Sequence, residues 1–309
     1  MENKKLMPLC PICGNDNSIN HLFVRDYRLN KVNHEISLIK CINCEHVWQD
    51  PMPEEINLLQ YYDENFYESK GVKFSLRAQL INKIQFYGLT QSIREVFGGR
   101  PIKILDYGSG QGQLIAYLTR LGHDVEGCEI SKSGREISKN RYGFNIHDAS
   151  DDFFAKNTEK YDLIILSHVL EHLPNPIEYV EKLKKLISNE GYIAVDVPNI
   201  NSWEAGIYKG IYIHLDIPRH VHHYSKKSLK ILMGKFLLYS RSLNGLYAIQ
   251  FPISGLRSLQ NFIRYKNKYN SLINFILIIF LPLQITISIL SNKFSNEKIC
   301  IGGFFGKNK

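Results

Sequence analysis

From Pro101 onward, short apolar runs alternate with segments whose apolar residues recur at the spacing of an amphipathic helix. The apolar runs predict β-strands at 102–107, 124–129, 143–147, 161–166 and 191–197. The other segments predict helices at 74–96, 111–121, 132–142, 175–188 and 226–236. Strands that are separated by helices pair in parallel, so the pattern predicts an α/β, doubly wound, Rossmann-like sheet with its ligand at the carboxyl ends of the strands.

Four of the six cysteines form two pairs, each a Cys-x-x-Cys turn, with 27 residues between the pairs. Such turns direct two thiolates each at one ion, and four sulfurs close its shell. The predicted ligands of a structural Zn²⁺ are Cys10, Cys13, Cys41 and Cys44. A redox pair is the alternative, but Pro11 and Gly14 are typical of a ribbon turn. With the rigid Asp50-Pro51-Met52-Pro53 segment as its end, we expect a zinc ribbon and linker at 1–53 and a second domain at 54–309.

The first strand of the predicted sheet runs into a glycine-rich turn, Asp106-Tyr-Gly-Ser-Gly-Gln-Gly112, and then into a helix. Closely spaced glycines let a ligand approach the backbone at the start of that helix. Glu129 ends the second strand 19 residues after Gly110, where a carboxylate can accept hydrogen bonds from ribose hydroxyls. The glycine spacing is G-x-G-x-G with an acid before it, which argues against a nicotinamide-dependent dehydrogenase.

These residues resemble the class I S-adenosylmethionine-dependent methyltransferases over about residues 60–247. The resemblance implies a seven-stranded sheet whose last strand is antiparallel, with the sixth strand at 238–249 and the seventh at 298–306. It implies S-adenosylmethionine as the cofactor. The residues implied to contact it are Asp106, Gly108, Gly110, Glu129, Asp148, Ser167 and His168. Together with the ribbon, the chain also resembles zinc-ribbon methyltransferases of bacterial surface-sugar and secondary-metabolite pathways.

A histidine-rich loop follows the fifth strand, at the place where this fold covers the methyl group. Because histidine titrates nearest neutrality, His220 is the first candidate for a general base and His223 the second, with loop support as the alternative role of both. His168, Glu171 and His172 share one helical face. Ubiquinone-type O-methyltransferases resemble this patch but have a glutamate at the first position, in a magnesium site. The histidine here favours polar support of the loop.

The formal net charge of +8 is unevenly distributed along the chain. Residues 1–216 carry 24 basic and 29 acidic residues, whereas residues 217–296 carry 11 basic residues and no acidic residue. An insertion before the last strand, at about 251–295, combines this charge with 24 uncharged residues at 269–292. We expect it to lie on an anionic membrane surface; a dimer or tunnel core and a true span are the alternatives.

The N-terminus has no apolar leader, so the sequence favours a cytoplasmic protein, peripheral on the inner face of the membrane. The predicted reaction is methyl transfer to a hydroxyl, or less favourably a carbon, of a small or lipid-linked metabolite such as a glycan or quinone precursor. Two rivals stay open: an RNA methyltransferase, although nucleic acid fits the apolar insertion less well, and a zinc-ribbon adaptor with a vestigial donor fold. The sequence predicts no oligomeric state.

Overall fold

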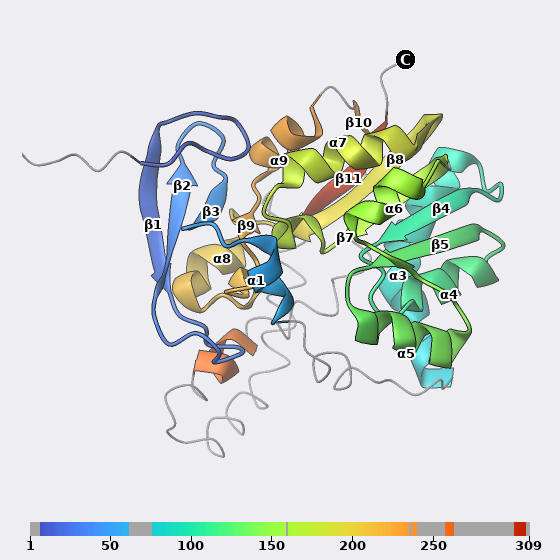
Figure 1. Cartoon of the computed structure of the whole chain (residues 1–309), viewed down its shortest axis with the longest axis horizontal. Helices are drawn as coiled ribbons and strands as arrows, with labels where there is room; N and C mark the ends of the chain where they lie inside the picture. Colours follow the sequence, from blue (N-terminus) through green and yellow to red (C-terminus); the bar gives the residue numbers. More distant parts are fainter. Residues whose placement is uncertain are drawn as a thin grey trace, which may run out of the picture.

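The computed structural model describes residues 7–61, 76–158, 160–234, 237–239, 257–262 and 300–306. Two sheets organise these residues (Figure 1). A central sheet of seven strands has the order β10-β11-β8-β7-β4-β5-β6, and a four-stranded sheet near the N-terminus has the order β1-β2-β3-β9. The predicted α/β fold class is confirmed.

Five strands of the central sheet run parallel, as their separation by helices predicted. They are β4 (Lys103–Tyr107), β5 (Asp124–Glu129), β6 (His147–Asp148), β7 (Tyr161–Ser167) and β8 (Ile187–Pro198). The connecting and flanking helices are α3 (Leu76–Phe97), α4 (Gln113–Arg120), α5 (Lys132–Tyr142), α6 (Asp151–Lys156), α7 (Pro176–Leu186) and α9 (Lys226–Met233). The main shift is at β6, which is short and begins at the last residue of its predicted range, 143–147.

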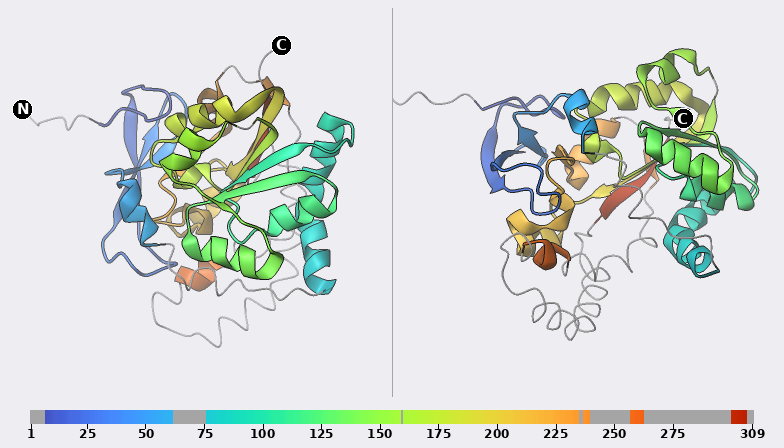
Figure 2. Two further views of the ribbon diagram at one scale, coloured as in Figure 1. Left: turned by 45° about the vertical axis from the view of Figure 1, so that its right-hand side comes forward. Right: turned by 60° about the horizontal axis from the view of Figure 1, so that its bottom comes forward.

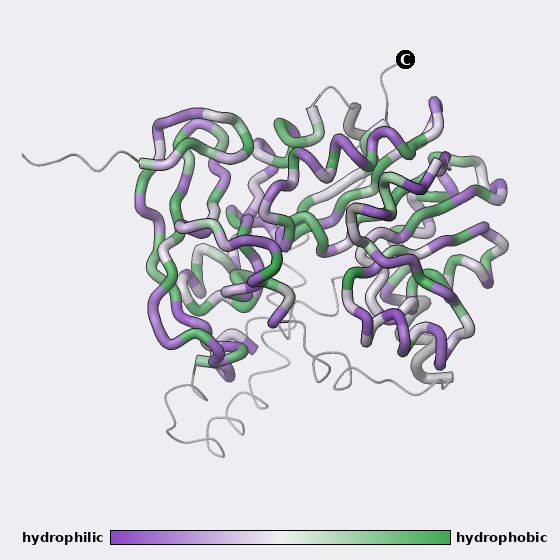
Figure 3. Tube along the Cα trace, viewed as in Figure 1, coloured by the Kyte–Doolittle hydropathy of each residue, from purple (hydrophilic) through white to green (hydrophobic). Residues whose placement is uncertain are grey.

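Successive residues of the strands pack against helices on opposite faces of the central sheet. Leu105 and Ile164 belong to a buried cluster with α7 and α9. Their neighbours Ile104 and Ile165 belong to a second cluster with α3 and α4. Figure 2 shows these helices on the two sides of the sheet, and Figure 3 shows that α5 is largely hydrophilic. Because both faces are covered, β7 and the second half of β8 carry runs of apolar residues, which made them readable in the sequence.

The last strand, β11 (Cys300–Gly306), pairs antiparallel with β8 on one side and with β10 (Leu237–Tyr239) on the other. This arrangement confirms the antiparallel last strand. The predicted basic and apolar insertion lies outside the described residues except for a helical piece at 257–262. Within the part of the chain that is described, no helix is long and apolar enough to cross a membrane.

The N-terminal sheet consists of β1 (Ser18–Val24), β2 (Ile36–Cys41), β3 (Val47–Asp50) and β9 (His222–His223). Short elements pack near it: α1 (Glu55–Leu59), α8 (Trp203–Tyr208) and three 3-10 turns, η1 (Leu170–His172), η2 (Lys209–Ile211) and η3 (Ile213–Leu215). In Figure 1, β9 lies between β1–β3 and the central sheet, and α8 lies at the lower ends of β1 and β2. Since β9 comes from the chain that follows β8, the predicted second domain contributes one strand to the N-terminal sheet.

Candidate functional site

Four neighbouring strands bring most of the predicted donor-binding residues to one edge of the central sheet. The sheet order places β7, β4, β5 and β6 side by side, and all four run in the same direction. Asp106 therefore lies near the end of β4, Glu129 at the end of β5, Asp148 at the end of β6 and Ser167 at the end of β7. This is the edge at which doubly wound sheets bind ligands.

The glycine loop joins β4 to α4 through residues with positive φ. Gly108, Gly110 and Gly112 have φ values of 81°, 55° and 76°, a region that residues with a Cβ avoid. A Cβ on Gly108 would lie 2.4 Å from Cγ2 of Val169, so the loop packs closely on the segment after β7. At the other side, the N–H of Gly110 donates to Oε2 of Glu129 at 2.8 Å. The loop is thus fixed from two neighbouring strands.

Two carboxylates, both nearly buried, face the glycine loop region: Asp106 is 4% exposed and Glu129 is 6% exposed. Burial, and then the charge of Glu129, raises the pKa of Asp106 to about 7. Both oxygens of Glu129 accept backbone hydrogen bonds, from Gly110 and from Ser131 at 2.8 Å. Carboxylates carry negative charge and accept hydrogen bonds, so this pair of acids suits a ligand that carries positive charge and hydroxyl donors.

Asp148 lies next to Glu129 across the β5–β6 pair, but its side chain is 53% exposed. Its Oδ2 accepts a 2.7 Å bond from Arg135, whose other guanidinium nitrogen donates to the backbone oxygens of Glu129 and Ile130. Arg135 therefore fastens the ends of β5 and β6 together. A ligand that reaches Asp148 meets a carboxylate that already has a cationic partner.

His168 adopts a positive φ of 56° directly after Ser167, which turns the chain sharply away from β7. Its Nδ1 lies 3.0 Å from Oε1 of Glu171. Glu171 is almost fully buried, and its Oε2 has no hydrogen-bond partner among the described residues. Glu171 thus gives η1 a buried polar side chain. Val169, directly before η1, packs against Gly108, so η1 also lies close to the glycine loop.

The predicted base candidates lie in the histidine loop, which we define as residues 219–224. His220 Nδ1 lies 2.8 Å from the carbonyl oxygen of His214, and its ring meets that of His172 edge-on at 4.5 Å. Burial, then the charges of His172 and His223, lowers the pKa of His220 well below its usual value. The loop is held against η1 because the N–H of Val221 donates to the backbone oxygen of Glu171 at 2.8 Å. His220 thus lies at the same edge as the predicted donor residues.

His223 is buried on β9, and its Nε2 has no hydrogen-bond partner within the described ranges. Burial, and then His222, lowers its pKa to about 3. One ligand atom each of Glu171, His172 and His220 lies within 4.8 Å of the others, a set that differs from the predicted His168-Glu171-His172 patch because His220 replaces His168. His172 Nδ1 also lies 3.1 Å from the carbonyl oxygen of Arg219, which fits the predicted polar support of the loop.

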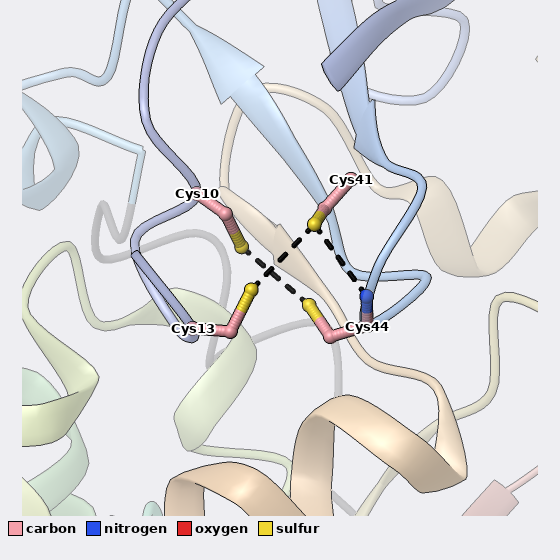
Figure 4. A group of neighbouring side chains, drawn as sticks. All are labelled: Cys10, Cys13, Cys41 and Cys44. Carbon is pink, nitrogen blue, oxygen red and sulfur yellow. Dashed lines mark hydrogen bonds between the residues drawn. The ribbon is translucent and has the colours of Figure 1, made fainter. Parts of the chain in front are cut away.

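The four cysteines of the two knuckles converge on one point (Figure 4). Sγ of Cys10 lies 3.5 Å from Sγ of Cys44, Sγ of Cys13 lies 3.6 Å from that of Cys41, and all four lie within 4.8 Å of one another. Zn–S bonds of about 2.3 Å give a tetrahedral S···S edge of about 3.8 Å, so the spacing suits Zn²⁺. The hydrogen bond between Cys10 and Cys44 lowers the pKa of Cys10 to about 5 and raises that of Cys44, so in the metal-free pair one sulfur is a thiolate and the other keeps its proton.

Three polar residues that contact the histidine loop or the segment before it were not predicted from the sequence: Asp216, Arg28 and His46. Burial alone would raise the pKa of Asp216, but Arg28, 2.8 Å away, and Arg219 hold it below its usual range. Asp216 Oδ2 also lies 3.5 Å from His220 Nε2. Asp216 lies shortly before the candidate bases in the chain, and this position could have suggested it as their partner. Arg28 and His46 come from the ribbon, far away in the chain; no motif surrounds Arg28, and the knuckle that precedes His46 does not mark this histidine as a partner of the loop.

A family model described as a methyltransferase domain matches residues 78–236. Among curated proteins, the ubiquinone biosynthesis O-methyltransferase of Haemophilus ducreyi is 25% identical over 159 residues, which cover 48% of this chain and 66% of that protein. The enzyme of the same name from Bartonella bacilliformis is 30% identical over 149 residues, covering 46% and 60%. The matches thus span roughly three fifths to two thirds of these relatives. Among solved structures, the plantazolicin methyltransferase BamL, in complex with a triazolic desmethylPZN analog and SAH, is 21% identical with a TM-score of 0.49, covering 83% of this chain and 92% of that one.

Proposed function

The chain belongs to the family of class I S-adenosylmethionine-dependent methyltransferase domains, and on that premise we propose that it transfers a methyl group from S-adenosylmethionine to a small or lipid-linked metabolite. The observation that carries the proposal is the pair of buried acids, Asp106 and Glu129, on either side of a glycine loop that Glu129 holds through Gly110. An acceptor hydroxyl is favoured over a carbon because neutral histidines lie at the same edge.

The residues present suit this donor. S-adenosylmethionine carries a sulfonium and an ammonium group, and two buried carboxylates favour a cation in a site of low dielectric. The Glu129 carboxylate is the acceptor type that ribose hydroxyls bind, and the glycines leave room for close approach to the backbone. We assign Asp106, Gly108, Gly110 and Glu129 to the methionine and ribose end, with Asp148, Ser167 and His168 as the outer contacts. The bound donor supplies the chemistry, an electrophilic methyl group on a good leaving group.

The protein would then align the acceptor, exclude water and remove a proton. His220 is the better placed base. A carbonyl oxygen can only accept, so Nδ1 of His220 carries the proton that faces His214, and Nε2 keeps its lone pair. Nε2 lies 3.5 Å from the carboxylate of Asp216, which would stabilise the imidazolium after proton transfer. His223 is the second candidate through its buried Nε2.

The four-cysteine site is proposed to hold a structural Zn²⁺, because its four sulfurs have tetrahedral spacing and leave no position for a substrate. We further propose that residues 251–295 bring the protein to an anionic membrane surface, on the strength of their acid-free charge and apolar run. A lipid-linked acceptor would then be methylated at the membrane. Cosedimentation with anionic but not neutral vesicles is the expected result; equal recovery with both would exclude charge-driven binding.

The function is tested by incubating the protein with methyl-labelled S-adenosylmethionine and separate soluble, RNA and membrane-lipid fractions. Label in the lipid or soluble fraction supports the proposal, whereas label in RNA supports the rival that uses the ribbon as a nucleic-acid surface. Calorimetry with S-adenosylhomocysteine tests the donor fold independently. Protein that binds neither donor nor product would instead be an adaptor with a vestigial fold.

A further inference from the structure

The ribbon and the histidine loop form one continuous sheet. Strand β9 of the loop pairs antiparallel with β3 of the ribbon, with Val47 opposite His223 and Trp48 opposite His222. The N–H of Gln49 continues this contact by donating to the backbone oxygen of Val221 at 3.0 Å. Any movement of the ribbon strand is therefore transmitted to the backbone that carries the candidate bases.

A chain of hydrogen bonds crosses the same junction. His222 Nε2 lies 3.2 Å from the carbonyl oxygen of Pro174, and since a carbonyl only accepts, this nitrogen carries the proton. His222 Nδ1 is then an acceptor, so His46 Nε2, 2.9 Å away, must donate to it. Both imidazoles are fully buried. The direction of these two hydrogen bonds is therefore fixed: His46 donates to His222, and His222 donates to the segment that follows η1.

His46 is itself tied to the second cysteine knuckle. Its carbonyl oxygen accepts a 2.9 Å bond from the N–H of Cys41. The loop returns to the same knuckle two residues after β9, where the hydroxyl of Ser225 donates to the carbonyl oxygen of Cys44 at 2.8 Å. Besides the β3–β9 pairing, two buried contacts thus join this part of the ribbon to the loop: His46 with His222 and Cys44 with Ser225.

We propose that His46 is a positioning residue, through which the ribbon holds the histidine loop in the orientation that presents His220 to the donor edge. Losing its Nε2–H would leave His222 with a buried, unpaired acceptor beside β9, a defect whose usual cost is enough to loosen a two-residue strand. Asp106, Gly108, Gly110 and Glu129 lie on β4, on β5 and in the loop after β4, whereas β3, β9 and the segment after η1 form the junction, so donor binding should be retained. The effect on methyl transfer rests on the proposed function; the effect on the loop does not.

Hydrogen exchange of the full-length protein, followed by mass spectrometry of peptides that cover residues 219–224, tests the proposal. His46→Ala is expected to accelerate exchange in the loop at least tenfold, and His46→Gln to restore it because the amide Nε2 can donate from a similar position. Ile93→Ala, a buried truncation on α3 far from the ribbon, is the control for general destabilisation. Equal loop exchange in His46→Ala and wild type, or in His46→Ala and Ile93→Ala, would overturn it.

Two further readouts separate positioning from a merely structural role. The Kd for S-adenosylhomocysteine is expected to change less than twofold in His46→Ala, whereas the nitrogen NMR signal of His222 Nδ1 should shift to that of an unbonded acceptor. Once a fraction that contains the acceptor is identified, the kcat of His46→Ala should be lower than that of the wild type, whereas the KM for the donor should be unchanged. A tenfold loss of donor affinity would contradict the proposal, because the ribbon would then support the whole site. Failure of methyl transfer in the wild type would leave the exchange result intact.

Discussion

The backbone N–H of Gly110 donates a 2.8 Å hydrogen bond to Oε2 of Glu129. This bond ties the turn after β4 to the end of β5, so the glycine loop and the proposed ribose-binding acid form one unit. The other oxygen of Glu129 accepts from Ser131, which also caps α5 by accepting from Gly134. Two backbone hydrogen bonds therefore fix the orientation of this carboxylate before any ligand binds.

Replacing Glu129 by glutamine should weaken donor binding by roughly 10- to 100-fold, since it removes a buried charge and one acceptor for hydroxyl donors. Calorimetry with S-adenosylhomocysteine measures the change. Glu136→Gln, on the exposed side of α5, is the matched control and should bind like the wild type. Equal affinities of both variants would remove Glu129 from the donor site.

Donor affinity should depend on pH around neutrality. The pKa of Asp106 is raised from 3.8 to about 7, so its carboxyl ionises between pH 6 and 8 and then attracts the cationic donor. Affinity for S-adenosylmethionine should rise over this range and level off above it. The stability of the donor-free protein should change in the opposite direction. The folded acid holds its proton more tightly than the unfolded one, so stability falls as pH rises from about 4 to 7. Asp106→Asn should flatten both profiles; a pH-independent affinity in the wild type would contradict this role.

Adding a single methyl group at Gly302 should disrupt the last strand. A Cβ there would lie 1.9 Å from the backbone oxygen of Val195 in β8, which no side-chain movement can relieve. Gly302→Ala is expected to lower the free energy of unfolding by about 3 kcal/mol. Gly206→Ala in α8, where a Cβ meets open space, should be neutral or stabilising by about 0.5–1 kcal/mol. Urea denaturation of the two variants compares them directly, and a neutral Gly302→Ala would refute the β8–β11 register.

Purified protein is expected to contain one zinc ion per chain, measured by elemental analysis. Cys44→Ser should lose the metal and unfold at a lower temperature, because the closed sulfur shell joins the two knuckles. Cys128→Ala, which removes a buried cysteine on β5, should keep the zinc. Full zinc content in Cys44→Ser would show that the ion binds elsewhere.

His220→Ala should lower kcat by roughly 10²- to 10⁴-fold if His220 removes the acceptor proton, with donor affinity unchanged. Because burial lowers its pKa below the usual value, the rate should be insensitive to protonation of His220 at neutral pH and fall only in acid. His147→Ala, a half-exposed histidine on β6, is the control. If His223→Ala loses activity and His220→Ala does not, the second candidate takes the role.

Much of the fold was readable because it depends on local pattern. Strands buried on both faces give continuous apolar runs, and the glycine loop and Glu129 lie in adjacent β-α units whose strands pair. The strand predicted at 143–147 lies at His147–Asp148 instead, where both residues are exposed and no apolar pattern marks a strand. The sequence ranked His220 before His223, but it could not reveal the contact of His220 with Asp216 or the burial of His223, because both arise only when the loop packs.

By itself, the sequence determined the doubly wound sheet, the glycine loop with its partner acid, and the two cysteine knuckles, because each depends on residues close in the chain or on the repeating order of strands. Only the tertiary structure decided that the ribbon shares a sheet with the histidine loop. That contact joins Trp48 to His222, and His46 to the same histidine, across more than 170 residues. Neither segment has a pattern that specifies the other; their pairing follows from burial of complementary backbone edges and imidazoles, which exists only in the folded chain.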